Sequence, residues 1–220
     1  MNDIKAAFTY SVPVLLGYMA IGIAFGLLLV DAGYPWWLSL VMSIVMYAGA
    51  GQFIAVGLFA AGVGLAEAAL VQLVVNARHI AYGLSMLKRF NRTGPFKYYL
   101  IFALTDETFA LLSSLPDQEK RGRFLFLVAL LDQSYWVLGS VIGAMAGSLL
   151  PFTLDGIGFA LSALFVVLMI EQILRVRKAQ VFIIAALAAV LTVFVLPARL
   201  SLLSAMVIAL VAVQLISMKK

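Results

Sequence analysis

The stretch LTDETFALL, residues 104–112, places four polar side chains in the middle of an apolar segment that covers 98–115. Thr105 followed by Asp106 and Glu107 is typical of a helix start. A hydroxyl caps the first free N–H groups there, and acidic residues favour the positive end of the helix dipole. In a bilayer, a helix that begins at mid-depth belongs to a broken helix, which is tolerated only where it lines a cavity or is buried in protein. Two carboxylates and two hydroxyls at that depth predict a functional site, if the chain lies in a membrane.

The composition indicates that the chain does lie in a membrane. Of its 220 residues, 65% are hydrophobic and 11% are charged, whereas a soluble domain is about 45–50% apolar and about 25% charged. We therefore expect an all-α, polytopic integral membrane protein, with residues 1–220 forming a single transmembrane domain. The apolar runs do not alternate, which excludes the strands of a membrane barrel. The net charge of +5 comes from short basic segments between apolar runs, a pattern that orients membrane proteins and does not predict nucleic-acid binding.

A bilayer core of about 30 Å needs about 20 helical residues, and eight segments are candidates for spans. We expect six to eight of them to cross the membrane, and the first to be a retained helix, not a cleaved signal peptide. Segment 98–115 is the exception, because basic clusters at 88–97 and 120–123 flank it. If both clusters face the cytoplasm, this segment is broken or re-entrant; otherwise one cluster lies outside. The candidate segments are 11–30, 38–60, 64–87, 98–115, 124–149, 156–174, 180–197 and 200–217.

Two pairs of segments suggest an internal repeat with an offset of about 120 residues. LLGYMAIGIAFG (15–26) resembles VLGSVIGAMAGS (137–148), and segment 37–53 is placed similarly to 157–173. Gly-rich spans also resemble one another through composition alone, so both explanations stay open. A true repeat would suit a transporter built from two related halves.

A second polar group interrupts the segment QLVVNARHIAYGLSMLKRF, residues 72–90. On a helix, Asn76 and His79 share one face, while Arg78 points almost opposite to Asn76. Either the helix unwinds near Asn76, or Arg78 reaches a carboxylate on another helix, for which the acidic pair of the broken element is the expected partner. The alternative is structural: Arg78 and His79 would only end the helix near the basic interface.

The stretch MYAGAGQF, residues 46–53, is the third candidate. Gly49 and Gly51 weaken a helix, and Gln52 follows them. An unwound point here would aim the free N–H groups of the next half-helix at an anionic group, as at substrate-carboxylate sites of transporters. Close packing through small residues explains the same glycines without a site.

Asp132 is the remaining candidate. It lies about a third of the way into segment 124–149, beside Gln133 and Ser134. It serves either as a polar contact between helices or as part of a proton path, and the sequence does not decide between the two.

The stretches YAGAGQF, VNARHIAYGLS and LTDETFALL occur in an order and spacing that resembles the AzlC-type branched-chain amino acid permeases. GYMAIGIAFG and DQSYWVLGSVIGAMAG fit the same likeness, which covers roughly residues 8–175. The resemblance implies a multi-pass protein of the bacterial inner (plasma) membrane that exports branched-chain amino acids and analogues such as azaleucine. It also implies a small hydrophobic membrane subunit of the AzlD type as partner. The family commonly has Ser at the position of Ala50, so a hydroxyl contact there would be missing.

These residues predict a substrate site at the two broken helices. The first half-helix N-terminus would bind the substrate carboxylate, and an acidic side chain of the second break would face the ammonium group. Arg78 would hold the acids until substrate competes for them, and His79, whose unperturbed pKa lies between pH 5 and 8, is a candidate for proton coupling. The predicted substrate-binding residues are Gly49, Ala50, Gly51, Gln52, Asn76, Asp106 and Glu107, and the predicted coupling or gating residues are Arg78, His79 and Asp132.

Two other classes stay open: a passive channel for a small solute, and a scaffold subunit whose partner carries the substrate path. The mid-membrane carboxylates favour a transporter, because a scaffold has little use for them. The chain has no cysteine and one His, so we expect neither a metal site nor a cofactor. We expect no enzymatic activity, because the sequence has no zinc-protease spacing, no serine elbow and no two-acid protease motif.

Overall fold

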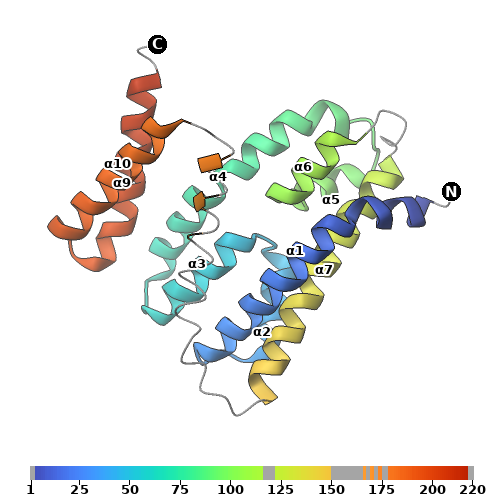
Figure 1. Ribbon diagram of the computed structural model, residues 1–220, viewed down its shortest axis with the longest axis horizontal. Helices are drawn as coiled ribbons and strands as arrows, with labels where there is room; N and C mark the ends of the chain where they lie inside the picture. The colour runs from blue at the N-terminus through green and yellow to red at the C-terminus, as the bar shows by residue number, and fades with distance from the viewer. Residues whose placement is uncertain are drawn as a thin grey trace. The chain divides into compact units, whose positions relative to one another are not determined.

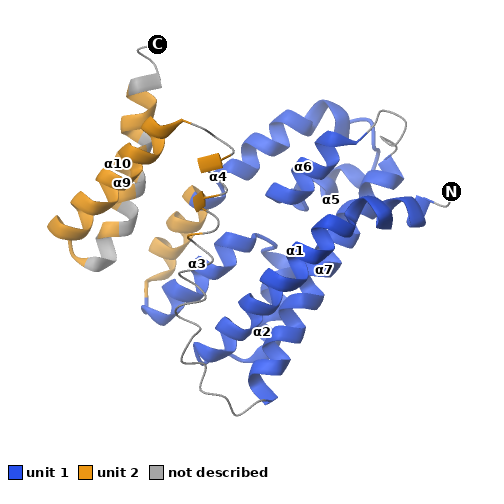
Figure 2. Cartoon of the chain, in the orientation of Figure 1, with its two compact units in different colours: residues 1–62, 75–157 blue, residues 63–74, 158–220 orange. Residues whose placement is uncertain are grey.

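The computed structural model of the chain describes residues 3–115, 122–149, 166, 169–170, 173–174 and 178–217. Every regular element in these residues is an α-helix, so the prediction of an all-α fold is confirmed (Figure 1). The chain divides into two compact units, which Figure 2 distinguishes by colour. Unit 1 comprises residues 1–62 and 75–157, and unit 2 comprises residues 63–74 and 158–220. All the predicted site residues belong to unit 1.

Unit 1 is built around two long helices, α1 (Asp3–Asp31) and α7 (Gly122–Leu149), which lie side by side (Figure 1). A Cβ atom at Gly26 would overlap the backbone of α7, and one at Gly143 would overlap the backbone of α1. The two helices therefore pack backbone to backbone, as small residues permit in membranes. They run in the same direction, because their contacts advance together: Ser11 with Tyr135, Tyr18 with Gly139, Ile23 with Gly143, and Leu27 with Gly147.

The second predicted segment is a hairpin of two short helices, α2 (Trp36–Val45) and α3 (Gly49–Ala60). α2 follows the end of α1 and packs along α7. α3 returns toward the starting point, since the ring of Phe59 lies 5.6 Å from that of Tyr34 in the turn between α1 and α2. The predicted unwound point is confirmed at residues 46–48. The chain turns back there, however, and the expectation that it continues across the membrane is wrong.

A second hairpin follows α4 (Leu65–Phe90) and consists of α5 (Phe96–Phe102) and α6 (Asp106–Ser114). α5 runs along the first part of α7, where the rings of Phe96 and Phe126 lie 4.8 Å apart. α6 runs back along α4. Near its end, the carbonyl of Leu112 accepts a hydrogen bond from Arg89 of α4. The charge pattern left two explanations open for segment 98–115: a broken or re-entrant segment, or a basic cluster outside the cytoplasm. The structure supports the first, because the segment forms a hairpin.

The re-entrant hairpin accounts for the position of the basic clusters. Gly122, at the start of α7, lies against Thr93, which follows α4. Lys88, Arg89 and Arg123 therefore lie at the same end of unit 1. The chain between them need not cross the membrane. Lys120 and Arg121 are outside the described residues.

The two hairpins enter unit 1 from opposite ends. α1 leads into the α2–α3 hairpin, and α4, which runs opposite to α7 and hence to α1, leads into the α5–α6 hairpin (Figure 1). A long helix followed by a hairpin thus occurs twice with inverted direction, an arrangement typical of transporters. It is not the repeat expected from the sequence, because segments 15–26 and 137–148 lie on α1 and α7. Segment 157–173 is mostly outside the described residues.

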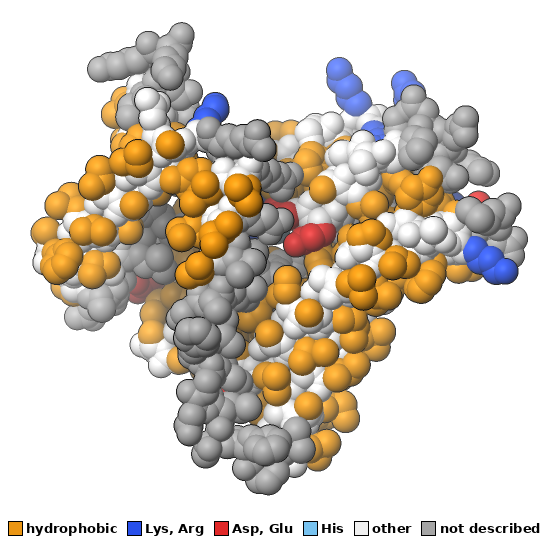
Figure 3. Space-filling model, viewed as in Figure 1, with side chains coloured by type: hydrophobic (Ala, Val, Ile, Leu, Met, Phe, Trp, Pro, Cys, Tyr) orange, Lys and Arg blue, Asp and Glu red, His pale blue; other side chains and the backbone are white. Residues whose placement is uncertain are grey.

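Unit 2 holds the first turns of α4 and the paired helices α9 (Ala179–Val195) and α10 (Ala198–Ser217). These two match predicted segments, whereas segment 156–174 is mostly outside the described residues. Figure 3 shows hydrophobic side chains over the visible faces of α1, α7 and α9, as suits contact with lipid. Among the described helices, α1 and α7 are long and apolar enough to cross a bilayer, so the expected count of six to eight spans is not confirmed.

Candidate functional site

The tips of the two hairpins meet at Tyr18 in the middle of α1. At the first tip, Tyr47 has a positive φ of 40°, and its ring packs edge-on against Tyr18, with 6.4 Å between centroids. At the second tip, the hydroxyls of Thr105 and Tyr18 are in hydrogen-bond contact. The rings of Tyr47 and Phe102, one from each hairpin, also lie 6.4 Å apart. Two half-helices, α3 and α6, therefore begin close to each other and to α1.

Gln52 holds the first break together. Its side-chain oxygen accepts hydrogen bonds from the backbone N–H of Ala48 at 3.3 Å and from the indole N–H of Trp136 at 2.9 Å. Its amide nitrogen donates to the hydroxyl of Ser43 at 3.2 Å, and the side chain is fully buried. These bonds keep the two half-helices in position. Direct substrate contact by Gln52 stays a prediction.

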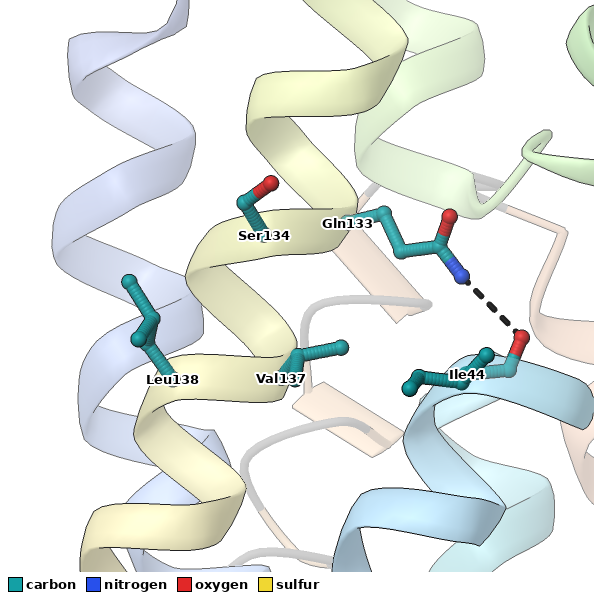
Figure 4. A pocket seen from close by; sticks show the side chains of 5 residues that line it. All are labelled: Ile44, Gln133, Ser134, Val137 and Leu138. Atoms are coloured by element: carbon teal, nitrogen blue, oxygen red, sulfur yellow. Dashed lines mark hydrogen bonds between the residues drawn. The ribbon is translucent and has the colours of Figure 1, made fainter.

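Gln133 on α7 stabilises the same break from a neighbouring helix. Its amide nitrogen donates to the carbonyl of Ile44 in the last turn of α2 at 3.1 Å (Figure 4). Its amide oxygen accepts from the hydroxyl of Tyr99 at 2.7 Å. A carbonyl at a helix end lacks an intrahelical partner, so this bond satisfies a group that lipid cannot. Beside it lies an open cavity of about 370 Å³, lined by Ile44, Gln133, Ser134, Val137 and Leu138 (Figure 4).

The second break has the cap predicted from the sequence. Thr105 is the N-cap of α6, and its side chain accepts a hydrogen bond from the backbone N–H of Thr108 at 3.2 Å. Asp106 and Glu107 occupy the first turn, where the helix dipole favours a negative charge. The break therefore places two acids at the centre of unit 1.

Arg78 pairs with Asp106, as the sequence predicted for the acidic pair. Its guanidinium nitrogen lies 2.7 Å from the carboxylate, and the two side chains are 34% and 20% exposed. Tyr82 donates a second hydrogen bond to Asp106, and its ring stacks on Phe109 with 4.4 Å between centroids. Arg78 therefore reaches a carboxylate on another helix. The alternative that α4 unwinds near Asn76 is wrong, because α4 is continuous there.

The other predicted residues of α4 lie close to this pair. His79 is half-buried, with its ring 6.0 Å from that of Tyr82. Asn76 is half-buried as well. Since Arg78 and His79 both sit well before the end of α4 at Phe90, neither ends the helix, and that structural explanation is wrong.

Asp132 is fully buried and faces α6. The hydroxyl of Thr108 donates to one of its oxygens at 2.9 Å. This bond joins α7 to the start of α6, as the first of the two alternatives, a polar contact between helices, predicts. The proton path stays a prediction. Glu107, on the same half-helix, accepts a hydrogen bond at 2.9 Å from the hydroxyl of Tyr18.

Sequence reasoning missed the tyrosines and the tryptophan of the site. Four aromatic residues place a polar ring atom or a ring face at a break: Tyr18, Tyr47, Tyr82 and Trp136. Nothing in their spacing distinguishes them from ordinary core aromatics. The usable signal was their place inside the stretches that carry the family likeness. Within the described residues, no group of three His, Asp or Glu side chains is arranged to hold a metal ion.

The part of the chain that matches a known protein family includes all the residues of this site. The AzlC protein family matches residues 13–150. An uncharacterized membrane protein of Helicobacter pylori is 44% identical over 177 residues, covering 80% of this chain and 78% of that protein. The branched-chain amino acid transport protein AzlC of Bacillus subtilis is 36% identical over 176 residues (79% and 69%), and the inner membrane protein YgaZ of Escherichia coli is 34% identical over 198 residues (85% and 80%). No solved structure matches the chain.

Proposed function

This chain belongs to the AzlC family, and on that premise we propose that it exports branched-chain amino acids across the bacterial inner membrane. The name of the Bacillus subtilis relative supports the substrate class. The observation that carries the proposal is that two half-helix N-termini, an ion pair and a further carboxylate meet in the middle of unit 1. An amino acid carries one carboxylate and one ammonium group, so its binding needs partial charges of both signs.

Glu107 is the better partner for the substrate ammonium group. Asp106 already binds Arg78 and accepts a hydrogen bond from Tyr82. Glu107 accepts a hydrogen bond from Tyr18 and is paired with no Lys or Arg of the described residues, and its side chain is exposed. A carboxylate with free acceptor capacity can bind an ammonium group without first losing a cation.

The N-terminus of α3 is the proposed site for the substrate carboxylate. Gly49, Ala50 and Gly51 form its first turn, where backbone N–H groups point outward along the helix axis. The positive end of the helix dipole adds to this attraction. Gln52 contributes by holding the break, and Asn76 is proposed as a polar contact from α4.

Arg78 and the stacked rings of Tyr82 and Phe109 form the proposed gate. Arg78 pairs with Asp106 and neutralises its charge. When the substrate enters, its two charged groups compete with that ion pair, and its aliphatic side chain lies against the aromatic stack. Binding of the substrate would then loosen the ion pair between Arg78 and Asp106.

Proton coupling and a small AzlD-type subunit complete the proposal. His79, beside Arg78 on α4, and Asp132, on α7, are the candidate coupling groups. The partner subunit is proposed from the family, and a bilayer is the medium in which both chains act. Neither a passive channel nor a scaffold role explains why the broken helices present both acids and an ion pair.

Counter-transport in reconstituted vesicles tests the function. Vesicles that hold this chain and the small subunit are loaded with unlabelled leucine, and entry of labelled leucine is measured. We expect saturable exchange, which Glu107→Gln lowers at least tenfold and the matched variant Glu67→Gln leaves intact. Flux that neither saturates nor exchanges would identify a channel, and full exchange by the small subunit alone would identify a scaffold; either result overturns the proposal.

A further inference from the structure

An unbroken row of oxygen atoms joins Glu107 to Asp132 through three hydroxyl groups. The Tyr18 hydroxyl lies 2.9 Å from Glu107 and contacts the Thr105 hydroxyl. The Thr105 hydroxyl lies 3.1 Å from that of Thr108, which lies 2.9 Å from Asp132. Tyr18 comes from α1, Thr105 and Thr108 from the start of α6, and Asp132 from α7. The row therefore links the proposed ammonium site to a carboxyl group buried between helices.

The number of hydrogens in this row is one too small when both acids are ionised. The row has four oxygen–oxygen contacts, but its three hydroxyls supply only three hydrogens. If Tyr18 donates to Glu107, Thr105 to Thr108 and Thr108 to Asp132, the contact between Tyr18 and Thr105 has no hydrogen. Two hydroxyl oxygens in contact without a hydrogen repel each other. One further proton, on either carboxyl group, gives all four contacts a hydrogen.

The surroundings of Asp132 favour holding that proton. Asp132 is fully buried, and no Lys or Arg of the described residues pairs with it. Its second oxygen accepts no hydrogen bond from the described residues. An isolated charge in such a place is costly. The other titratable groups in its electrostatic range are Glu107 and the phenols of Tyr18, Tyr47, Tyr99 and Tyr135.

Glu107 lies in a different field. Asp106 of the same helical turn and Arg78 of α4 carry opposite charges and pair with each other. Glu107 is also the more exposed of the two ends of the row. The two ends thus differ in access, as the ends of a route for protons must.

We propose that Glu107 and Asp132 share one proton and exchange it through Tyr18, Thr105 and Thr108. Glu107 gives its proton to Tyr18, Tyr18 gives its own to Thr105, Thr105 to Thr108, and Thr108 to Asp132. Each hydroxyl gains one hydrogen and loses one, so the net change is one proton moved from Glu107 to Asp132. Every hydrogen bond in the row reverses its direction, and no other reactant is needed.

This route deepens the proposed function and rests on it, because it makes substrate binding and proton position exclude each other. An ammonium group at Glu107 needs an ionised carboxylate. Its arrival therefore drives the shared proton to Asp132. In exchange, the same proton returns when the substrate leaves. In net export, Asp132 releases the proton to the side from which the substrate came, and Glu107 takes up another from the side to which the substrate is delivered, so one proton crosses for each substrate. His79 is not part of the row, so the coupling step does not require it.

Two transport readouts on the same vesicles, made with this chain and its small subunit, test the route. The first is leucine exchange without a pH gradient, which needs no net proton movement. The second is leucine accumulation driven by a gradient of one pH unit with the membrane potential clamped, which one-to-one coupling limits to about tenfold. Thr108→Val and Tyr18→Phe interrupt the row, and we expect the accumulation ratio to fall to about one while exchange remains measurable. Thr108→Ser restores the hydroxyl and should restore accumulation.

Tyr135→Phe is the matched control, because its hydroxyl bonds to Ser11 outside the row. It should accumulate leucine like the unmodified chain. Equal accumulation by Thr108→Val and Tyr18→Phe would overturn the route, as would exchange without any pH-driven accumulation in the unmodified chain. Absence of exchange in the unmodified chain would instead remove the proposed function. An infrared carboxylic-acid band that disappears in the Glu107→Gln, Asp132→Asn double variant is the further expected result, and its absence from the unmodified chain would refute the shared proton.

Discussion

Replacing Gln52 with Leu tests whether one amide holds the first helix break. Leu fills a similar volume but makes none of the three hydrogen bonds that Gln52 makes to Ala48, Trp136 and Ser43. The variant leaves two donors buried without an acceptor, the backbone N–H of Ala48 and the indole N–H of Trp136. The hydroxyl of Ser43 loses a donor in the same step.

The structure gives the size of the effect. Gln52 and Ser43 are fully buried, Trp136 is 3% exposed and Ala48 is 7% exposed. Each buried donor left unsatisfied costs about 1–3 kcal/mol, so the two together destabilise the fold by about 2–6 kcal/mol. A chain of this size loses about 2–4 °C of melting temperature per kcal/mol. We therefore expect the melting temperature to fall by at least about 4 °C.

Thermal unfolding in detergent, followed by the fraction of monodisperse protein, measures the shift. Gln214→Leu on α10 is the matched control, because Gln214 is exposed and the same substitution there should change stability by no more than about 0.5 kcal/mol. Adding Trp136→Phe removes one of the two orphaned donors, so the double variant should lose less stability than the sum of the two single ones. Equal melting temperatures for Gln52→Leu and Gln214→Leu would refute the role of the amide.

Two further outcomes follow from the packing and the ion pair. Gly143→Ala puts a methyl group into the backbone of α1 and should lower the yield of folded protein sharply, whereas Gly17→Ala, with nothing within 4 Å of the new atom, should fold normally; size-exclusion profiles of the two compare them directly. Arg78→Met leaves the carboxylate of Asp106 without its cation, so adding Asp106→Asn should recover part of the lost stability. At 34% and 20% exposure we expect a coupling of about 1–3 kcal/mol in a double-mutant cycle of melting curves, and strictly additive effects would show that the pair is not formed.

Local chemistry explains why some features were predictable from the sequence. The start of α6 was predicted to the residue, because a threonine cap with acids in the first turn depends on neighbours in the chain alone. The partner of Arg78 was predictable as well, since a cation inside an apolar segment needs a carboxylate and the chain offers few. Both inferences depend on a single short stretch and on the cost of burial.

Contacts between distant residues explain what was missed. A glycine-rich break looks the same whether the chain continues through the membrane or turns back, and the packing of α2 on α7 decides between them. The sequence did not predict that Gln52 holds the first break. Its hydrogen-bond partner Trp136 lies on another helix, and no pattern of spacing connects the two.

The polar residues of unit 1 fall into two groups with different physical tasks. A helix break inside lipid leaves backbone groups that must be satisfied by protein, and uncharged side chains do this: Gln52 and Gln133 at the first break and Thr105 at the second. The charged side chains Arg78, Asp106 and Glu107 cap no backbone group at the first break, and they remain partly exposed. If charges had been needed only to close the breaks, they would be as buried as Gln52. Their exposure agrees with the proposed site for a small zwitterion, because uncharged side chains already hold the two breaks in position.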